Sequence, residues 1–491
     1  MKNKSIWTIG VKDNSLPKLN KDITTDVLII GGGIAGLSLA YFLKDSKYNV
    51  LLIDKNKCGL GATSKNTGKL TFMQDLVYNK LLSNYNEEIA SLYLKSQKEA
   101  IDIICEIIRE NKINCHLKKT KAYVFSNDEN SISDFEKEIK FYQKNNIKCR
   151  KKESLPISYP SKIVLETDDS YVFNPYEYLV GLKDILKNKI TIYENTCCTS
   201  VDKDNDYYLC HTKNGNTIKA KYVIMATHYP IFIIPYFIPF KTIVERFFIG
   251  ASSIDKIKDI QILSHNDPSI SMRYYNNDMD NYFLYGRRNR KCTSSGDVRD
   301  DCNELNMEYN KYFGKDIDYF FHTHDIMTYD NLPFIGEVDN NLYIMTGFNK
   351  WGNTNSTIGG KLISDLILEK KNIYQDIFSP RRGISFDKIK NIPLFNVNVF
   401  YRYIANKINP KMIYYDDSVK IKMINGKRCG IYIDNDGNEH IVSNICPHMK
   451  CNLIFNYVDK TWDCPCHASR FDIDGNVISG PSVFDIKINN E

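Results

Sequence analysis

Apolar residues near the start of the chain follow the pattern of a strand, a helix and a second strand. Asp26–Ile30 form a short apolar run, which predicts a buried strand. A turn with closely spaced glycines follows at once, and Leu37–Leu43 then carry apolar residues at helical spacing. Asn49–Ile53 predict the second strand. This order of elements predicts a βαβ unit, in which a helix connects two parallel strands.

The middle of the chain shows two other periods. Residues 74–115 repeat apolar positions at helical spacing, and residues 130–145 predict a further helix at the surface. Residues 241–325 alternate between apolar and polar positions, as the strands of an antiparallel sheet do. The pattern therefore predicts an α/β domain of the Rossmann type together with a substrate domain built on a mixed β-sheet.

The C-terminal part of the chain is set apart by a connector. Residues 376–410 are locally basic between Ser379 and Lys390 and contain three prolines, which could not continue a helix. Short strands begin near Lys411. We therefore expect one unit over residues 1–375, a linker over residues 376–410, and an all-β domain over residues 411–491.

Composition limits the classes of function. The chain has 491 residues, of which 43% are hydrophobic, and this is enough for more than one core. A net charge of +6 is small for this length and gives no case for a nucleic-acid partner. The N-terminus lacks the apolar segment of a signal peptide, and the most apolar stretch, Tyr229–Phe240, is too short and too rich in proline to span a membrane. We expect a cytoplasmic protein without a transmembrane segment, in which Tyr229–Phe240 is either a buried connector or a loop that faces a membrane or a substrate.

Cysteine and histidine are the residues with the most chemistry. Ten of the fourteen cysteines are scattered along the chain, as expected for buried thiols in a reducing compartment. The other four lie with two histidines between positions 446 and 467. His322 and His324 lie on one face of a predicted strand, and two interpretations stay open for them: structural residues or residues of a substrate pocket.

The glycine turn has the spacing of a dinucleotide fingerprint. Gly31-x-Gly33-x-x-Gly36 lies between the first strand and the helix, and Asp54 follows about 20 residues after the turn. Such glycines let the backbone approach a pyrophosphate at the helix N-terminus, and the acidic residue accepts hydrogen bonds from a ribose. The alternative is a purely structural glycine turn. The fingerprint alone does not distinguish FAD from NAD.

Two ligand pairs stand in the C-terminal domain: Cys446-x-His448 and, fifteen residues later, Cys464-x-x-His467. The pairs and the residues around them resemble a Rieske [2Fe-2S] domain, in which two thiolates bind one iron and two neutral imidazoles bind the other. A zinc site with two cysteines and two histidines is the alternative. The resemblance also implies a disulfide between Cys451 and Cys466.

The same resemblance bears on the reduction potential of the cluster. Ser469 matches a hydroxyl that donates a hydrogen bond to a cluster sulfur, whereas Phe471 stands where high-potential members carry a tyrosine. Lys450 and Ala468 stand where glycine is usual. Rieske clusters span roughly −150 to +300 mV, and without the tyrosine we expect a potential below roughly +100 mV.

Three further segments, Gly61–Thr71, Tyr222–Thr227 and Asn331–Asn353, resemble the D-amino-acid-oxidase superfamily of flavoproteins. The chain as a whole resembles a bacterial FAD-dependent oxidoreductase of this superfamily with a C-terminal Rieske domain. The resemblance implies FAD-binding segments at about residues 20–75, 160–235 and 326–370, and a substrate domain at about residues 76–159 and 236–325. The residues expected to bind FAD are Gly31, Gly33, Gly36, Asp54, Lys55, Thr63, Ser64, Thr67, Gly68, Val201, Thr227, Gly347, Asn353 and Thr354.

The residues that catalyse the reaction are less defined. Lys69 and Trp351 are weak candidates, and so is Arg273, which lies among aromatic residues in the predicted substrate sheet and could bind a substrate carboxylate. Arg246, Arg287 and Arg288 fall in the same sheet.

The resemblance implies an enzyme that oxidises a CH–NH or CH–NH2 group of a small molecule and passes electrons through FAD and the cluster to a one-electron carrier protein. Electron flow in the reverse direction stays open. So do a flavin oxidase with the cluster as a redox sensor or structural element, and an electron-transfer protein without a small-molecule substrate. We expect the flavin pocket to be complete within residues 1–375.

Overall fold

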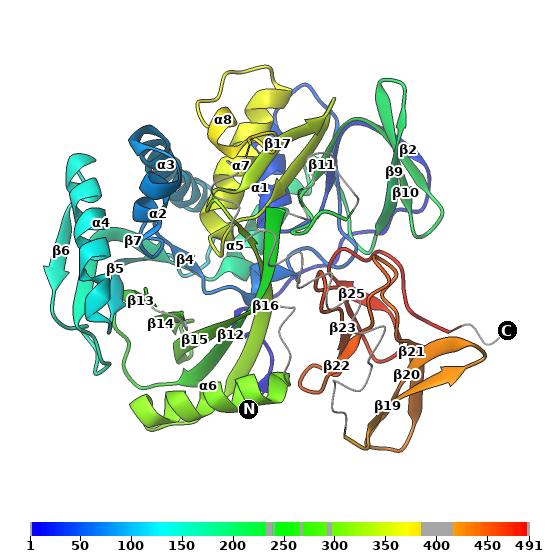
Figure 1. Ribbon diagram of the computed structural model, residues 1–491. Coiled ribbons are helices and arrows are strands. Elements are labelled where there is room, and N and C mark those ends of the chain that lie inside the picture. Colours follow the sequence, from blue (N-terminus) through cyan, green and yellow to red (C-terminus); the bar gives the residue numbers. More distant parts are fainter. Residues whose placement is uncertain are drawn as a thin grey trace.

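The computed structural model of the chain describes residues 2–231, 238, 241–265, 269–291, 297–383 and 416–488, with the backbone alone at 288–291 (Figure 1). Most of the expected linker, the expected start of the last domain near Lys411, and most of the stretch Tyr229–Phe240 lie outside the described residues. The N-terminal βαβ unit, two large sheets and two small C-terminal sheets all lie within them.

The first large sheet has eight strands, and the predicted βαβ unit lies at its centre. The strand order is β17-β18-β11-β2-β3-β8, and β10 joins β11 to β9. The strands β18, β11, β2, β3 and β8 are parallel neighbours, as expected for a Rossmann-like sheet. Their bounds are β2 Ile23–Ile30, β3 Val50–Ile53, β8 Thr191–Tyr193, β9 Cys198–Asp204, β10 Tyr207–Thr212, β11 Thr217–Met225, β17 Phe334–Asp339 and β18 Leu342–Thr346.

The second large sheet has ten mixed strands in the order β1-β16-β12-β15-β14-β13-β5-β7-β4, with β6 beside β7. The alternating segment 241–325 supplies β12 to β15 and most of β16, which pair antiparallel where they are neighbours. The segment 160–235 contributes to both sheets, because β7 pairs with β5 here. The bounds are β1 Lys2–Asn3, β4 Lys69–Leu70, β5 Lys118–Ser126, β6 Cys149–Lys152, β7 Ile163–Val172, β12 Thr242–Ser253, β13 Ile260–Ser264, β14 Ile270–Asn276, β15 Asn281–Lys291 and β16 Tyr319–Thr328.

Helices cover the large sheets. The expected helical segment 74–115 forms two helices, α2 Val77–Asn84 and α3 Glu87–Glu110, because Asn86 caps a new helix by accepting a hydrogen bond from the backbone N–H of Ile89. The expected surface helix forms as α4 Ile132–Lys144. The remaining helices are α1 Ile34–Leu43, α5 Pro175–Leu186, α6 Val298–Phe313, α7 Gly352–Ile367, α8 Gln375–Phe378, and the short 3-10 helices η1 Ile6–Thr8, η2 Ala62–Lys65 and η3 Glu129–Ser131. In the part of the chain that the structure describes, none of the helices combines the length and the apolar content needed to cross a membrane.

The C-terminal domain is all-β, as expected, with a three-stranded sheet β19-β20-β21 and a four-stranded sheet β22-β23-β24-β25. A small core around Trp462 and Phe471 fills the space between them. Figure 1 shows this domain (orange to red) beside β12 and β16 and below the β9–β10 hairpin. The bounds are β19 Val419–Ile424, β20 Lys427–Ile433, β21 Glu439–Ser443, β22 Ile454–Asn456, β23 Thr461–Asp463, β24 Arg470–Phe471 and β25 Val477–Ser479.

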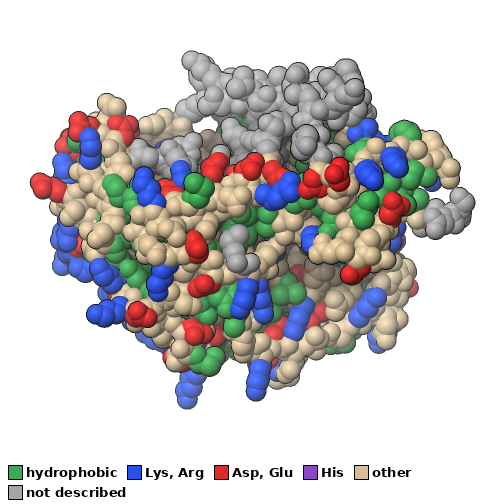
Figure 2. All heavy atoms as spheres, turned by 90° about the horizontal axis from the view of Figure 1, so that it is seen from below, with side chains coloured by type: hydrophobic (Ala, Val, Ile, Leu, Met, Phe, Trp, Pro, Cys, Tyr) green, Lys and Arg blue, Asp and Glu red, His purple; other side chains and the backbone are tan. Residues whose placement is uncertain are grey.

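Charged side chains of both signs share the surface. On the face seen in Figure 2, Lys and Arg side chains are interspersed with Asp and Glu side chains. This mixture agrees with the small net charge of +6. The field of that face is therefore mixed in sign, which does not favour a polyanionic partner there.

Two glycines allow the tight turn between β2 and α1. Gly31 has a φ of 113°, a conformation that favours glycine. Gly36 lies on α1 directly over the turn, and a Cβ atom there would lie 1.9 Å from the carbonyl oxygen of Gly31. The first helix can therefore pack on the turn only because position 36 has no side chain.

Gly36→Ala should lower the free energy of unfolding by at least about 2 kcal/mol, because the added methyl group meets rigid backbone. Urea denaturation of the whole chain measures this change. Gly61→Ala is the matched control, since a Cβ atom at Gly61 meets nothing within 4 Å and should leave stability nearly unchanged. Equal stabilities of the two variants would contradict this packing argument.

Candidate functional site

A cavity of about 460 Å³ lies where the two large sheets and the C-terminal domain meet. The glycine turn forms one wall, β16 and Val244 of β12 form another, and residues of the C-terminal domain form a third. The N-terminal residues of α7 also line it. A cavity of this size, lined by apolar groups with a few convergent polar groups, has the character of a cofactor or substrate site.

The turn end of the cavity fits a dinucleotide. A Cβ atom at Gly33 would meet only the Thr63 hydroxyl oxygen, at 3.5 Å, so the space in front of the turn is open. Asp54 fixes the turn, because its carboxylate accepts hydrogen bonds from the backbone N–H groups of Gly32 at 2.7 Å and Asn56 at 2.8 Å. Burial raises the pKa of Asp54 to about 6. An FAD pyrophosphate would lie against the N-terminus of α1 here.

Most of the residues expected to bind FAD line this one cavity, although they come from distant parts of the sequence. These are Gly31, Gly33, Asp54, Lys55, Thr63, Thr67, Thr227, Asn353 and Thr354, together with the catalytic candidates Lys69 and Trp351. Five others do not line it: Gly36, Ser64, Gly68, Val201 and Gly347. Val201 lies on β9 against the core of the eight-stranded sheet, and Thr196, Cys197 and Cys198 at the start of that strand line the cavity instead.

Arg273, the weak candidate for binding a substrate carboxylate, does not line the cavity. Its side chain is fully buried outside the cavity, and its guanidinium donates hydrogen bonds to the backbone oxygens of Thr67 and Gly68 at 2.9 and 2.5 Å. The guanidinium carbon also lies 5.1 Å from the centroid of the Trp7 ring and 5.7 Å from that of Tyr275. The Nη1 atom of Arg273 thus holds the loop that precedes β4.

Lys69 is a buried amine in the cavity wall. Its Nζ donates hydrogen bonds to the backbone oxygen of Ile262 and the hydroxyl of Ser271, both at 2.7 Å. Burial lowers the pKa of Lys69 well below its ordinary value. A buried amine with a lowered pKa that lines the cavity is suited to proton transfer, so Lys69 remains a candidate for a catalytic role.

Three histidines that precede the C-terminal domain lie in the cavity wall. His228, His322 and His324 line the cavity, and burial lowers the pKa of each. The pocket interpretation of His322 and His324 therefore agrees with their position. His228 has a φ of 68° and contacts the backbone oxygen of His324 at 2.7 Å. No local signal marked His228, since it follows β11 in a turn whose shape the sequence pattern does not reveal.

The four expected cluster ligands converge in the C-terminal domain. The thiols of Cys446 and Cys464 are in hydrogen-bonding contact, and the rings of His448 and His467 lie 5.1 Å apart at 90°. The Nδ1 atoms of both histidines are buried without a hydrogen-bond partner. Burial lowers the pKa of His467 to about 3 and also lowers the pKa of His448, so both imidazoles are neutral. Two thiols and two unpartnered neutral nitrogens are the ligand set of a Rieske cluster.

The loops that carry these ligands are fixed by a disulfide and by unusual backbone. Cys451 and Cys466 form the expected disulfide, with an S–S distance of 2.02 Å. Lys450 and Ala468, which stand where the family usually has glycine, have φ angles of 59° and 61°. This left-handed conformation costs roughly 1–2 kcal/mol in a residue with a side chain. The loop shape thus explains the family's glycines, and this chain keeps the shape without them.

Two residues next to the cluster set the number of hydrogen bonds to its sulfurs. Ser469 is fully buried and hydrogen-bonds the Cys446 thiol, in agreement with the expected role. Phe471 is also fully buried, in the core that contains Cys446 and Cys464, and its ring has no donor to offer.

The cluster domain forms part of the cavity wall. His467, Ala468 and Arg470 line the cavity, together with Ile478–Gly480, Ser482 and Val483. The ring of His467 lies 6.0 Å from that of Tyr229, and Ala468 packs with Tyr229 and Val244. The expectation that the flavin pocket is complete within residues 1–375 is therefore wrong, because residues beyond position 466 close one side of it.

Known proteins match this architecture. The family model for FAD-dependent oxidoreductases matches residues 26–366, and the model for Rieske [2Fe-2S] domains matches residues 410–488. YhfW of Bacillus subtilis (strain 168), a protein named for a Rieske 2Fe-2S cluster, is 30% identical over 98% of this chain and 96% of its own length. Gamma-glutamylputrescine oxidoreductase of Escherichia coli (strain K12) is 25% identical over 71% of this chain and 85% of its own. Glycine oxidase from Geobacillus kaustophilus superposes with a TM-score of 0.61 at 17% identity, over 74% of this chain and 100% of that one.

The chain therefore belongs to the FAD-dependent oxidoreductase family and carries a C-terminal Rieske domain. Its cofactors are FAD and a Rieske-type [2Fe-2S] cluster. The zinc alternative is set aside, since the Rieske model covers both ligand loops.

His448→Cys should abolish the Rieske-type EPR signal of the reduced protein, because a thiolate replaces a neutral imidazole on the iron. FAD should remain bound, since His448 does not line the cavity. Iron analysis, EPR and the flavin absorbance measure these outcomes together. Met449→Leu at the exposed neighbouring position is the control and should keep the signal. Stoichiometric zinc without iron in protein made anaerobically would refute the assignment.

Ser469→Ala should lower the midpoint potential of the cluster, and Phe471→Tyr should raise it. A hydrogen bond to a ligand sulfur stabilises the reduced, more negative cluster more than the oxidised one. If part of the free energy of that bond is gained only on reduction, the midpoint potential shifts by on the order of 50 mV. Redox titration followed by EPR measures both shifts. Potentials that stay at the wild-type value in both variants would show that these positions do not tune the cluster.

Proposed function

We propose that this protein oxidises an amine at its FAD and passes the electrons singly through the Rieske cluster to an external one-electron carrier. The observation that carries the proposal is the shared cavity: the cluster ligand His467 and the FAD fingerprint residues Gly31 and Gly33 line the same space. Two redox sites that border the same cavity need no diffusing carrier to pass electrons between them.

The two cofactors have complementary chemistry. FAD accepts two electrons from a substrate carbon at once and a Rieske cluster accepts one at a time, so the pair supplies a two-to-one electron conversion. The protein supplies the binding site, the orientation of the groups and the exclusion of water. The buried Lys69, with its lowered pKa, and the residues of the cavity wall are placed to serve these roles.

An amine is the substrate class that agrees best with the cavity and the relatives. Arg273 does not line the cavity, and its Nη1 donates hydrogen bonds to the backbone oxygens of Thr67 and Gly68. The carboxyl groups among the described residues of the cavity wall are those of Asp54 and Asp325, and Asp54 already holds the turn. Burial raises the pKa of Asp325 to about 7, although the nearby Lys350 lowers it. A substrate ammonium beside Asp325 would supply the positive charge that this carboxyl group lacks.

The relatives point to the same chemistry. One is named for oxidation of gamma-glutamylputrescine, and a structural neighbour is named for oxidation of glycine. Both compounds carry an amino group on a carbon that bears hydrogen. We infer that this chain acts on a CH–NH or CH–NH2 group, with the nitrogen directed toward Asp325.

Anaerobic mixing with a panel of amines, including glycine, a secondary amino acid and gamma-glutamylputrescine, should bleach the flavin first and then the cluster. The order follows because hydride transfer can reach only the two-electron acceptor. Stopped-flow absorbance at flavin and cluster wavelengths measures both steps. Asp325→Asn should weaken binding of a cationic amine by about tenfold, the effect of losing about 1.4 kcal/mol of ion pairing.

Two results would contradict the proposed function. One is a flavin that none of these amines reduces. The other is a flavin that is reduced and then re-oxidised by O2 while the cluster stays oxidised, which would favour a flavin oxidase with a structural or sensing cluster.

A further inference from the structure

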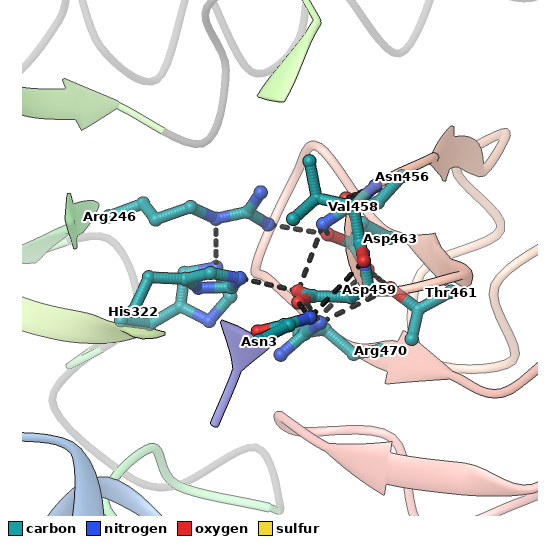
Figure 3. A network of polar contacts seen from close by, with 10 residues as sticks. Asn3, Arg246, His322, Asn456, Val458, Asp459, Thr461, Asp463 and Arg470 are labelled. Atoms are coloured by element: carbon teal, nitrogen blue, oxygen red, sulfur yellow. Dashed lines mark hydrogen bonds and ion pairs between the residues drawn. The ribbon is translucent and has the colours of Figure 1, made fainter. Parts of the chain in front are cut away.

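A buried polar network joins the Rieske domain to the ten-stranded sheet (Figure 3). Its residues, which we call the interdomain bridge, are Asn3, Arg246 and His322 from the sheet, and Asp459, Asp463 and Arg470 from the Rieske domain. Arg246 donates a hydrogen bond to Asp463 at 2.5 Å, and His322 contacts Asp459. Asn3 donates to Asp459 at 2.7 Å.

The charges of the bridge balance only when the two domains meet. The Rieske domain contributes the carboxylates of Asp459 and Asp463 and one guanidinium, that of Arg470, which pairs with both. Arg246 supplies the second positive charge from across the boundary. Arg246, Asp463 and Arg470 are each less than a tenth exposed. Buried charges are stable only when they are paired, so separation of the domains would leave a carboxylate short of its partner.

His322 completes the bridge as a neutral donor. Burial lowers the pKa of His322 to about 4, an effect that Asp459 opposes and that Arg246 and Arg470 reinforce. Burial also disfavours the ionised form of Asp459, but the contacts with His322, Arg470 and Asn3 lower its pKa overall. The neutral imidazole therefore donates its Nε2–H to an ionised carboxylate, a charge-assisted hydrogen bond. The ring also packs against Phe248 and Phe320, with centroids 5.7 and 6.1 Å away.

The bridge is attached to both ends of the second ligand loop. Asp463 immediately precedes the ligand Cys464, and Arg470 follows the ligand His467 by three residues. Holding Asp463 and Arg470 therefore holds the loop between them. In this position the loop places His467 in the cavity wall, with its ring centroid 6.0 Å from that of Tyr229.

We propose that Arg246 and His322 are positioning residues that hold the cluster's second ligand loop at the FAD cavity, so that electrons pass between FAD and cluster within one chain. The proposal rests on the part of the proposed function that places the two cofactors on one electron path, and it is independent of the substrate. Each transfer toward the cluster takes one electron from the reduced flavin and converts one ferric iron to ferrous. A one-electron carrier then removes that electron before the second follows.

Two peripheral contacts between the domains serve as a comparison. Arg299 pairs with Asp416 at 3.0 Å, and Lys213 pairs with Asp485 at 2.6 Å. The basic side chains of both pairs are more than two-fifths exposed, and neither pair includes a residue of the second ligand loop. Exposed ion pairs contribute little to the stability of a contact. Arg299→Ala is therefore a matched control that removes a contact between the domains without touching the bridge.

The test is laser-flash reduction of the whole, cofactor-loaded protein with photoexcited deazaflavin and EDTA, which delivers single electrons and needs no substrate. The rate at which flavin and cluster exchange the electron is read from their absorbances. Arg246→Met should slow this exchange by at least about tenfold, since it leaves a buried carboxylate underpaired, and His322→Phe should slow it by about threefold or more. His322→Gln, which keeps a donor for Asp459, and Arg299→Ala should stay within about twofold of wild type.

Three controls separate positioning from folding. The EPR spectrum of the reduced cluster and its potential should match wild type in the His322 variants, and electron-exchange rates are compared only in protein with full FAD content. Hydrogen exchange of the backbone amides in residues 459–471 should be faster in Arg246→Met and His322→Phe than in His322→Gln. If Arg246→Met loses the cluster, the comparison of electron-exchange rates in His322→Phe and His322→Gln decides whether the bridge positions the loop.

Unchanged electron exchange in His322→Phe and Arg246→Met would overturn the proposal, as would equal rates for His322→Phe and His322→Gln. A failure of the amine panel to reduce the flavin would contradict only the substrate assignment, because the flash experiment supplies its own electrons.

Discussion

The ion pair between Arg246 and Asp463 is the contact on which, we propose, the arrangement of the two redox sites depends. It crosses the boundary between the ten-stranded sheet and the Rieske domain with both partners buried. A buried pair of this kind contributes little when compared with a well-packed apolar contact, but breaking it by losing one partner costs about 3–5 kcal/mol. We propose that its main effect is on geometry: in the docked position the charges of the Rieske domain are paired, and His467 lines the cavity.

The cluster loops are stabilised in a different way. Their ligands must be thiolates and neutral imidazoles before any iron binds, and the burial of His448 and His467 keeps both rings neutral. The disulfide between Cys451 and Cys466 links the two loops, and left-handed residues at 450 and 468 turn the backbone around the ligands. The disulfide and the turned backbone thus fix the loops within the domain, and the interdomain bridge is proposed to orient them toward the cavity.

Much of this protein could be predicted from sequence where the chemistry is local. The glycine spacing fixes a turn, because a Cβ atom at Gly31 would meet the end of the neighbouring strand β11 and one at Gly36 would meet the carbonyl of Gly31. The ligand pairs at 446–448 and 464–467 are likewise short segments with a fixed geometry. Fold class and cofactors followed from these segments, and the family matches bear them out.

What failed or stayed open depends on distant pairing. Arg273 has a side chain that often binds substrate carboxylates, but its hydrogen-bond partners are backbone oxygens about 205 positions away in the sequence. His322 had no visible partner in sequence, because Asp459 lies 137 positions further along the chain and in another domain. Val201 was placed three residues past the point where β9 meets the cavity, since a strand pattern does not say where along its length a ligand approaches. The third wall of the cavity could not be predicted, because domain docking leaves no periodic pattern in either domain.

Above all, we propose that FAD and cluster exchange electrons within a single chain. The most direct measurement is the dependence of the cluster reduction rate on protein concentration, followed by rapid-freeze EPR after a flash has reduced the flavin anaerobically. If the docked arrangement is the working one, the first-order rate constant will be the same at every concentration. A rate constant that rises in proportion to protein concentration would show that electrons pass between molecules, and the shared cavity would then not be the route.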